Sequence, residues 1–179
     1  MRRLAPRRAA IAATPAGASF SRGRKYRYLL WRRWGGGPAA NFVMLNPSTA
    51  DERRLDPSCT RARNYARRWG YGAMIVTNLF ALRATDPARL RRARDPAGGR
   101  ANDRAILAAA REAALVVCAW GNHGAFAGRS AKVVRMLERA GIRLHVLRLT
   151  AAGEPAHPLY LPAALMPRPW RRPRLERAL

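Results

Sequence analysis

Residues that can form hydrogen bonds or titrate follow four short apolar stretches of the sequence. These four polar clusters are residues 46–51, 77–78, 120–123 and 157–160. Together they contain amides, a carboxylate, imidazoles and aromatic rings. Amides can read the donor and acceptor edges of a planar heterocycle, and aromatic side chains can stack on its face. The combination therefore predicts a site that recognises a nucleobase or a similar ring.

Each cluster, taken alone, also has a purely structural explanation. Asn46 and Pro47 fit a turn that ends a strand, because proline fixes its own φ and holds the preceding residue extended. Trp120 fits a core position, and His157 fits a position on the surface. We favour function over a simple turn at Asn46 because similar polar strand ends recur later in the chain. Asp51 is open to two interpretations, a general base or a turn residue.

The apolar stretches before these clusters are predicted to be buried strands, because they are short, continuous and rich in β-branched residues. Helical segments separate them, which is typical of a parallel sheet with helices on both faces. Parallel strands bring their carboxyl ends to one edge of the sheet, where α/β proteins build their sites. The predicted strands are residues 42–45, 73–77, 115–119 and 144–149, and the predicted helices are residues 57–69, 87–94, 102–113 and 130–140.

Capping residues mark the ends of two of these helices. Asp56 or Ser58 can accept a hydrogen bond from the first free N–H groups of the helix at 57–69. Gly70 stands where a glycine commonly closes a helix. Asn102 is expected to cap the helix that follows it.

An aromatic-rich stretch, residues 26–34, predicts a further strand before the first polar cluster. It reaches the strand at 42–45 through the loop at 35–38, so we expect an antiparallel hairpin at the sheet edge. The sheet is therefore predicted to have four mainly parallel strands and one antiparallel N-terminal edge strand. We divide the chain into a basic disordered arm (1–19), one α/β domain (20–166) and a basic, proline-rich tail (167–179).

The charge of the chain is strongly one-sided. It carries 35 Lys and Arg residues against 10 Asp and Glu residues, which gives a formal net charge of +25. Biased codon usage can explain the many arginines but not the scarcity of acids. A basic surface attracts polyanions without sequence preference, so we expect nucleic acid or nucleotide as a partner. The apolar runs are too short to span a membrane, so no membrane association is expected.

The two cysteines, Cys59 and Cys118, have no zinc-type spacing. We expect both to be reduced and partly buried, with no metal site and no cofactor, which suits the cytoplasm. No serine or cysteine has an evident histidine partner, so a nucleophile–base triad is not predicted. The sequence also lacks a glycine-rich phosphate loop of standard spacing.

Five motifs resemble those of an uncharacterised bacterial and phage family of unknown function. The resemblance covers about residues 20 to 170 and implies no established activity. The motifs are MLNPSTAD at residues 44–51, RWGYG at 68–72, NLFALRAT at 78–85, WGNHG at 120–124 and HPLY at 157–160.

The order of strand ends also resembles the uracil-DNA glycosylase superfamily, which implies a three-layer α/β/α sandwich. In that resemblance Asn46, followed by Pro47, corresponds to the residue that positions the attacking water. Asn78 corresponds to the asparagine that reads the base, and a small Gly-containing turn follows a later strand, as at Gly121. His157 corresponds to the histidine that donates a hydrogen bond to the departing base, although the motif here is His-Pro-Leu-Tyr in place of His-Pro-Ser.

Three functions are compatible with these features. The first is a base-acting hydrolase that cleaves an N-glycosidic bond, and the second is a non-catalytic nucleic-acid-binding module on the same fold. The third is an enzyme of a small nucleoside or a modified base. For the first, the expected catalytic residues are Asn46, Asp51 and His157, and the expected substrate-binding residues are Pro47, Ser48, Thr49, Asn78, Trp120, Asn122, His123 and Tyr160.

Overall fold

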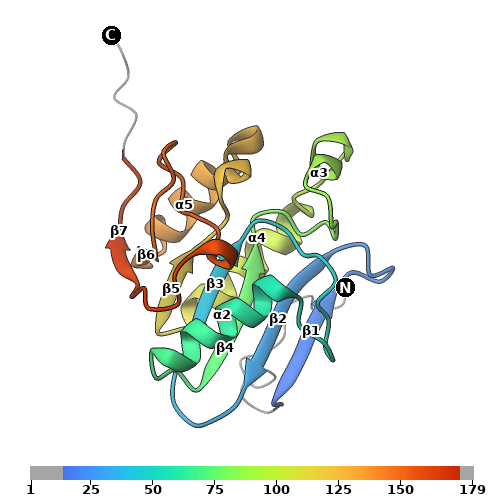
Figure 1. The fold of residues 1–179 in the computed structure, drawn as a ribbon. Coiled ribbons are helices and arrows are strands. Elements are labelled where there is room, and N and C mark those ends of the chain that lie inside the picture. Colours follow the sequence, from blue (N-terminus) through green and yellow to red (C-terminus); the bar gives the residue numbers. More distant parts are fainter. Residues whose placement is uncertain (1–13, 174–179) are drawn as a thin grey trace.

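A seven-stranded mixed sheet, with strand order β1-β2-β4-β3-β5-β6-β7, runs through the protein (Figure 1). The structure is a computed structural model that describes residues 14–173. The prediction of an α/β fold is confirmed, but the sheet is larger than expected. The strands are β1 (Ala16–Phe20), β2 (Arg27–Arg33), β3 (Ala39–Met44), β4 (Ala73–Asn78), β5 (Leu115–Cys118), β6 (Leu144–Val146) and β7 (Arg168–Trp170).

Four strands at the centre of the sheet, β4-β3-β5-β6, are parallel, as the sequence predicts. Every residue of β3, β4 and β5 is buried. Alternate residues of β3 serve the two faces: Phe42 and Met44 belong to one hydrophobic cluster and Val43 to another. Burial on both sides explains why these strands are apolar without interruption.

The predicted hairpin between the aromatic-rich strand and the first parallel strand is wrong. Strand β2 pairs antiparallel with β4 and with β1, and it has no pairing with β3. The loop after β2 crosses the start of β4, where Trp34 N donates to Gly72 O (3.0 Å) and Gly72 N donates to Pro38 O (3.0 Å). A Cβ atom on Gly72 would lie 1.8 Å from the carbonyl oxygen of Gly36. The missing side chain therefore lets the loop pass over β4.

Two edge strands lie partly or wholly outside the predicted domain. Strand β1 includes residues 16–19 of the predicted arm, and β7 lies in the predicted tail. Strand β1 is difficult to recognise in the sequence because most of its residues are small. One of them, Gly17, leaves room for the ring of Trp31, which would lie 2.1 Å from a Cβ atom added at Gly17. Strand β7 is difficult to recognise because it contains Pro169. Proline argues against a central strand but is tolerated in an edge strand such as this one. The rest of the predicted arm and tail, residues 1–13 and 174–179, is outside the described residues.

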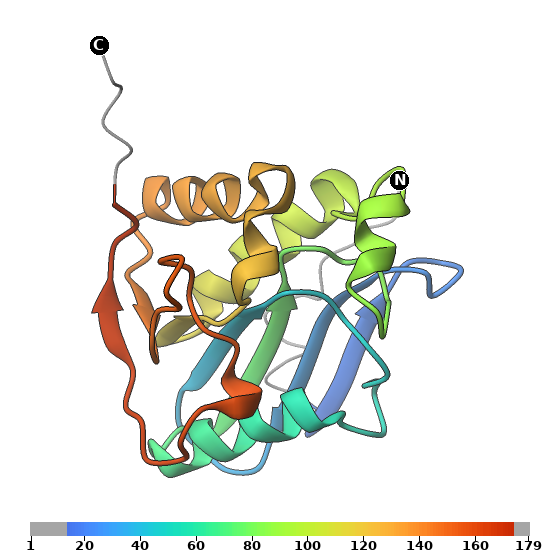
Figure 2. The ribbon, with the colours of Figure 1, turned by 45° about the horizontal axis from the view of Figure 1, so that its top comes forward.

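The helices cover both faces of the sheet (Figure 2). Helix α2 packs on one face together with Phe42 and Met44. Helices α4 and α5 pack on the other face together with Val43. The helical segments are α2 (Pro57–Arg68), α3 (Ala88–Arg92), α4 (Gly99–Glu112), α5 (Arg129–Arg139) and the short 3₁₀ segments η1 (Asn122–Gly128) and η2 (Pro158–Tyr160).

Helix α2 is capped by Asp56, as predicted, whereas the prediction for α4 is wrong. Helix α4 begins at Gly99, so Asn102 lies inside its first turn and not at its cap. The Asn102 side chain is buried and donates to the carbonyl oxygens of Asn78 (3.0 Å) and Leu79 (3.2 Å). It satisfies buried acceptors at the end of β4.

Cys59 and Cys118 are free and buried. Burial raises the pKa of Cys59 to about 12, and it also raises the pKa of Cys118. Both side chains are therefore neutral thiols at pH 7. Among residues 14–173, no helix combines the length and the apolar character that crossing a membrane requires.

Candidate functional site at the β3–β5 switch point

The order of the parallel strands reverses at the boundary between β3 and β5. From β3 the chain passes through α2 to β4 on one side, and the later strands β5 and β6 are added on the other side. The loops that follow β3 and β5 therefore lead to helices on opposite faces of the sheet. Open α/β sheets bind their ligands at such a switch point.

The loops after β5 and β6 contact each other at the carboxyl ends of the strands. Gly121 N donates to Pro155 O (2.7 Å), which ties the loop after β5 to the loop after β6. A Cβ atom on Gly121 would lie 3.6 Å from the Cβ atom of His157. The loop after β3 lies on the same side of the sheet, since Ala50 and Ala156 belong to one hydrophobic cluster. The structure thus brings the predicted clusters at 120–123 and 157–160 together.

His157 is half-buried at this meeting point. Burial lowers the pKa of His157, and the nearby Asp56 carboxylate opposes this only in part. The imidazole is therefore neutral at pH 7. Its Nδ1 accepts a hydrogen bond from Leu159 N (3.4 Å), so the proton of the neutral ring is on Nε2. His157 is set up as a neutral hydrogen-bond donor.

Asp56 is a buried carboxylate that sequence reasoning identified only as a helix cap. Its Oδ1 accepts from Cys59 N (2.8 Å), and its Oδ2 accepts from Ala50 N (3.4 Å). It also acts electrostatically on His157 and on Arg27. Asp56 therefore joins the start of α2 to the loop after β3, and its charge acts on His157.

Arg27, at the start of β2, was missed because nothing in the sequence separates it from the neighbouring arginines. Its side chain is 1% exposed and makes no ion pair within 4 Å among residues 14–173. Nη1 donates to Ala50 O (2.7 Å) and Nη2 donates to Asn78 Oδ1 (3.3 Å), while Nε has no partner. Burial, the largest effect, lowers the pKa of Arg27, and Cys59 and Asp56 oppose it.

The two asparagines at the ends of β3 and β4 each use one end of their amide to hold the backbone or Arg27. Asn46 Nδ2 donates to Pro47 O (3.0 Å) and Ala84 O (2.7 Å). Asn78 Oδ1 accepts from Arg27. Within the described chain, Asn46 Oδ1 and Asn78 Nδ2 make no hydrogen bond, which leaves one acceptor and one donor.

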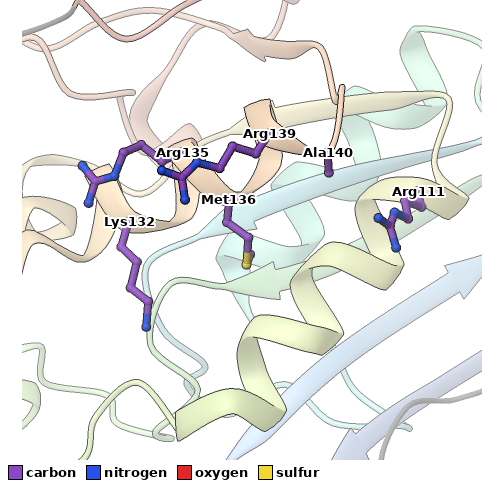
Figure 3. A pocket seen from close by; sticks show the side chains of 6 residues that line it. All are labelled: Arg111, Lys132, Arg135, Met136, Arg139 and Ala140. Carbon is purple, nitrogen blue, oxygen red and sulfur yellow. The ribbon is translucent and has the colours of Figure 1, made fainter.

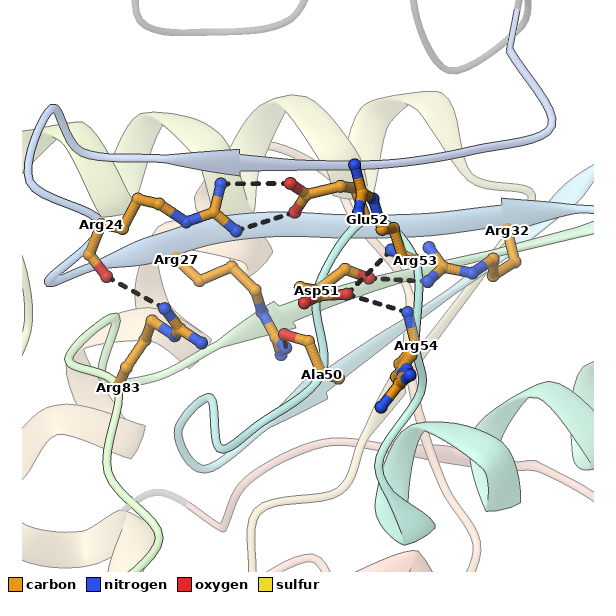
Figure 4. Close-up of polar contacts among 9 residues, drawn as sticks. All are labelled: Arg24, Arg27, Arg32, Ala50, Asp51, Glu52, Arg53, Arg54 and Arg83. Atoms are coloured by element: carbon orange, nitrogen blue, oxygen red, sulfur yellow. Dashed lines mark hydrogen bonds and ion pairs between the residues drawn. The ribbon is translucent and has the colours of Figure 1, made fainter.

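Asp51 has the geometry of a turn residue. Its Oδ1 accepts from Arg53 N and Arg54 N, both at 2.8 Å, and these bonds are the main reason that its pKa is lowered (Figure 4). The adjacent Glu52 forms a two-pronged ion pair with Arg24, at 2.8 and 3.2 Å. The carboxylate of Asp51 is thus already used to close the loop, in agreement with the turn interpretation.

The other predicted binding residues differ in accessibility. Trp120 is 1% exposed, its Nε1 donates to Glu154 Oε2 (2.7 Å), and its ring packs edge-on against Trp170. It is a core residue, and the ring cannot reach a ligand without leaving this packing. Tyr160 is 88% exposed and His123 is also exposed. Asn122 is exposed, and its Oδ1 accepts from Thr150 (2.6 Å).

The first loop contributes two hydroxyl groups that have no hydrogen-bond partner among the residues described. These belong to Ser48, which is half-buried, and Thr49, which is exposed. Pro47 is buried, and its carbonyl oxygen accepts from Ala84 N (2.8 Å) and from Asn46. Pro47 therefore positions the loop, whereas the hydroxyl groups of Ser48 and Thr49 are free to bind a ligand.

No metal cluster marks this site among residues 14–173. In the described part of the chain, no group of three His, Cys, Asp or Glu side chains is arranged to hold a metal ion. Three surface cavities are lined by residues of α4, α5, β6 and β7, and none of the predicted site residues lines them.

Comparison with known proteins gives one match. A family model described as "Protein of unknown function (DUF1643)" matches residues 27–159. The chain belongs to the DUF1643 family. The predicted membership of an uncharacterised family is thus confirmed, and the DUF1643 match spans Arg27, Asn46, Asn78 and His157. No curated protein and no solved structure gives a significant match.

Proposed function

We propose that this DUF1643 protein is a hydrolase that cleaves the N-glycosidic bond of a base in nucleic acid or in a nucleotide. The observation that carries the proposal is the neutral His157 imidazole at the switch point, with Nδ1 occupied and Nε2 left as donor. A leaving base gains negative charge on its exocyclic carbonyl oxygen, and a fixed donor at that oxygen stabilises this charge.

The proposed reaction breaks the bond between the sugar carbon and the base nitrogen. The electron pair leaves with the base, and His157 Nε2–H donates a hydrogen bond to the base oxygen. Water adds to the oxocarbenium-like sugar carbon, and its surplus proton finally resides on the released base. Asn46 Oδ1, which has no partner in the described chain, accepts a hydrogen bond from this water and orients it.

Base recognition is assigned to Asn78 in this proposal. Arg27 binds Asn78 Oδ1, so the opposite end of the amide, Nδ2, faces away from Arg27. A donor held in this way selects a base that presents an acceptor on its edge. The exposed ring of Tyr160 is proposed to stack on the base, whereas the ring of Trp120 is buried.

The arrangement of the helices supports a three-layer α/β/α sandwich of the uracil-DNA glycosylase type. Helix α2 packs on one face of the sheet, and α4 and α5 pack on the other. Both cysteines are unpaired thiols, which fits our proposal that the protein works in the reducing cytoplasm.

The test is a base-release assay on oligonucleotides that contain uracil, hypoxanthine, xanthine or mismatches, in single- and double-stranded form. Free nucleosides are added to detect a small-molecule enzyme. His157→Gln and Asn46→Ala are compared with Asn64→Ala, a matched control on the exposed face of α2. We expect each site variant to lose about 10²- to 10³-fold in rate, and the control to keep it. A folded wild-type protein that releases no base from any substrate contradicts the proposal.

A second candidate function is a non-catalytic nucleic-acid-binding module. It is favoured by one observation: the Asp51 carboxylate closes a turn and Asp56 accepts two backbone bonds, so neither is free to activate water. Salt-sensitive oligonucleotide binding without base release, unchanged by Asn46→Ala, would support this function in place of the hydrolase.

A further inference from the structure

A groove between α4 and α5 carries a concentration of positive charge. It has a volume of about 470 Å³ and is lined by four cationic side chains and two apolar ones (Figure 3). It lies on the face of the sheet opposite α2. The lining residues are Arg111, Lys132, Arg135, Met136, Arg139 and Ala140. These residues form the α4–α5 groove.

The positive charge of the groove is largely uncompensated. Within the described chain, Arg111, Arg135 and Arg139 make no ion pair within 4 Å. Lys132 Nζ is 3.1 Å from Asp103, but that carboxylate is shared with Arg129 at 2.6 Å. All four lining cations are exposed, and no acidic side chain lines the groove. An extended anion would therefore relieve repulsion among them.

The spacing of the cations fits a linear chain of negative charges. Lys132, Arg135 and Arg139 are three and four residues apart, so they share one face of α5. Seven residues of helix rise about 10 Å, which is about the rise of three nucleotides in one strand. Arg135 and Arg139 also line a neighbouring cavity, but there Glu138 lies among the lining residues and Arg172 is paired with Glu154.

We propose that the α4–α5 groove binds the phosphodiester backbone of a nucleic-acid strand without reading its sequence. The lining has no amide and no aromatic side chain that could contact base edges or faces. Helix α5 begins directly after the loop that follows β5, so the Lys132 end of the groove is the end nearer the switch point. The inference deepens the proposed function, because it gives the backbone of the substrate a defined place.

The experiment measures binding of a fluorescent 20-nucleotide DNA to the full-length protein by anisotropy, over a range of salt concentrations. The double variant Arg135→Gln/Arg139→Gln is compared with Arg67→Gln/Arg68→Gln on α2. Both pairs are exposed and change the net charge equally. We expect the groove variant to bind at least about tenfold more weakly at low salt, with a salt slope lower by about 1.4 to 1.8. The α2 variant should stay close to wild type.

Equal losses in both variants would overturn the inference, because the attraction would then belong to the overall charge. No loss in the groove variant would overturn it as well. Circular dichroism confirms that the variants are folded. Polyglutamate of matched charge should compete poorly, and equal competition would indicate an acidic protein partner in place of nucleic acid. Base release is measured separately: binding that depends on the groove without any release refutes the hydrolase and leaves this inference intact.

Discussion

Arg27 shows how a single side chain can join elements that are distant in the sequence. Its guanidinium links the backbone of the loop after β3 at Ala50 to the amide of Asn78 at the end of β4. A buried charge is costly unless it is well hydrogen-bonded. The hydrogen bonds from Arg27 to Ala50 and Asn78 therefore offset part of the cost of burying its guanidinium. Arg27 therefore holds the loop and the amide of the site in register.

The stability role of Arg27 is directly testable. Arg27→Ala leaves the acceptors at Ala50 and Asn78 unpaired and opens a void, so we expect a loss of about 2 to 4 kcal/mol in the free energy of unfolding. Urea denaturation followed by circular dichroism measures it. Arg68→Ala, on the exposed face of α2, should change stability by less than about 0.5 kcal/mol. An Arg27→Ala protein as stable as this control would contradict the proposed role.

His157 predicts a pH dependence with a defined sign. Its pKa in the folded protein lies below the ordinary value of 6.5, so the fold favours the neutral ring. The corresponding stabilisation is present above pH 6.5 and is lost as the pH falls through the folded pKa. NMR titration of the ring, assigned with His157→Gln, should give a midpoint below 6.5. A midpoint at or above that value would contradict the burial argument.

Asp56 gives this titration an internal check. The Asp56 carboxylate raises the pKa of His157, against the effect of burial. Asp56→Asn removes the charge but keeps the acceptor oxygen that Cys59 N uses at the start of α2. We expect the NMR midpoint of His157 to fall further in this variant. An unchanged midpoint would show that the two side chains do not interact.

At the scale of the elements, the crossing of the loop at 34–38 over β4 determines the order of the sheet. Gly72 hydrogen-bonds to Trp34 and Pro38 on that loop, and β4 can then pair with β2 on one side and β3 on the other. This insertion replaces the simple hairpin that the short loop suggests. It also puts Arg27 next to Asn78, because β2 runs antiparallel to β4.

Gly72→Ala tests the crossing. The added Cβ would lie 1.8 Å from the Gly36 carbonyl oxygen, which is a backbone atom and cannot rotate away. We expect a loss of about 1 to 3 kcal/mol in the free energy of unfolding, as for other overpacked sites. Gly35→Ala, in the same loop but with nothing within 4 Å of the added atom, is the control. Similar stability of both variants would show that the loop adjusts freely.

At the scale of the whole molecule, the net charge of +25 determines both the attraction of polyanions to the protein and the repulsion among its own charged side chains. The four cations of the α4–α5 groove are one local part of this excess. Like charges destabilise the compact state, whereas bound polyanions and dissolved salt relieve the repulsion. The same charge that attracts nucleic acid is therefore expected to lower the stability of the free protein.

The salt dependence of stability measures this repulsion. Raising sodium chloride from about 0.05 M to about 0.5 M shortens the screening length severalfold and should increase the free energy of unfolding. Urea, which is uncharged, serves as the denaturant. A sucrose series controls for solvent effects unrelated to screening. A free energy that falls with added salt would show that attractive ion pairs outweigh the repulsion.

Local patterns made much of the fold and part of the site predictable. Continuous apolar runs indicated the four parallel strands, and Asp56 indicated the start of α2. Both signals depend only on residues that are close together in the sequence. The same runs placed Asn46, Asn78 and His157 at strand ends or in the loops beyond them. The edge strands β1 and β7 escaped detection because they are short and contain glycine or proline.

The sequence by itself determined the α/β class, the parallel core and the positive charge, since each depends on composition or on short-range periodicity. The tertiary structure alone decided that β2 lies beside β4, that Trp120 is buried against Glu154 and that Arg27 reaches Asn78. These features depend on pairing between residues far apart in the chain. Many pairings satisfy the same local pattern, and only packing of the whole sheet selects among them.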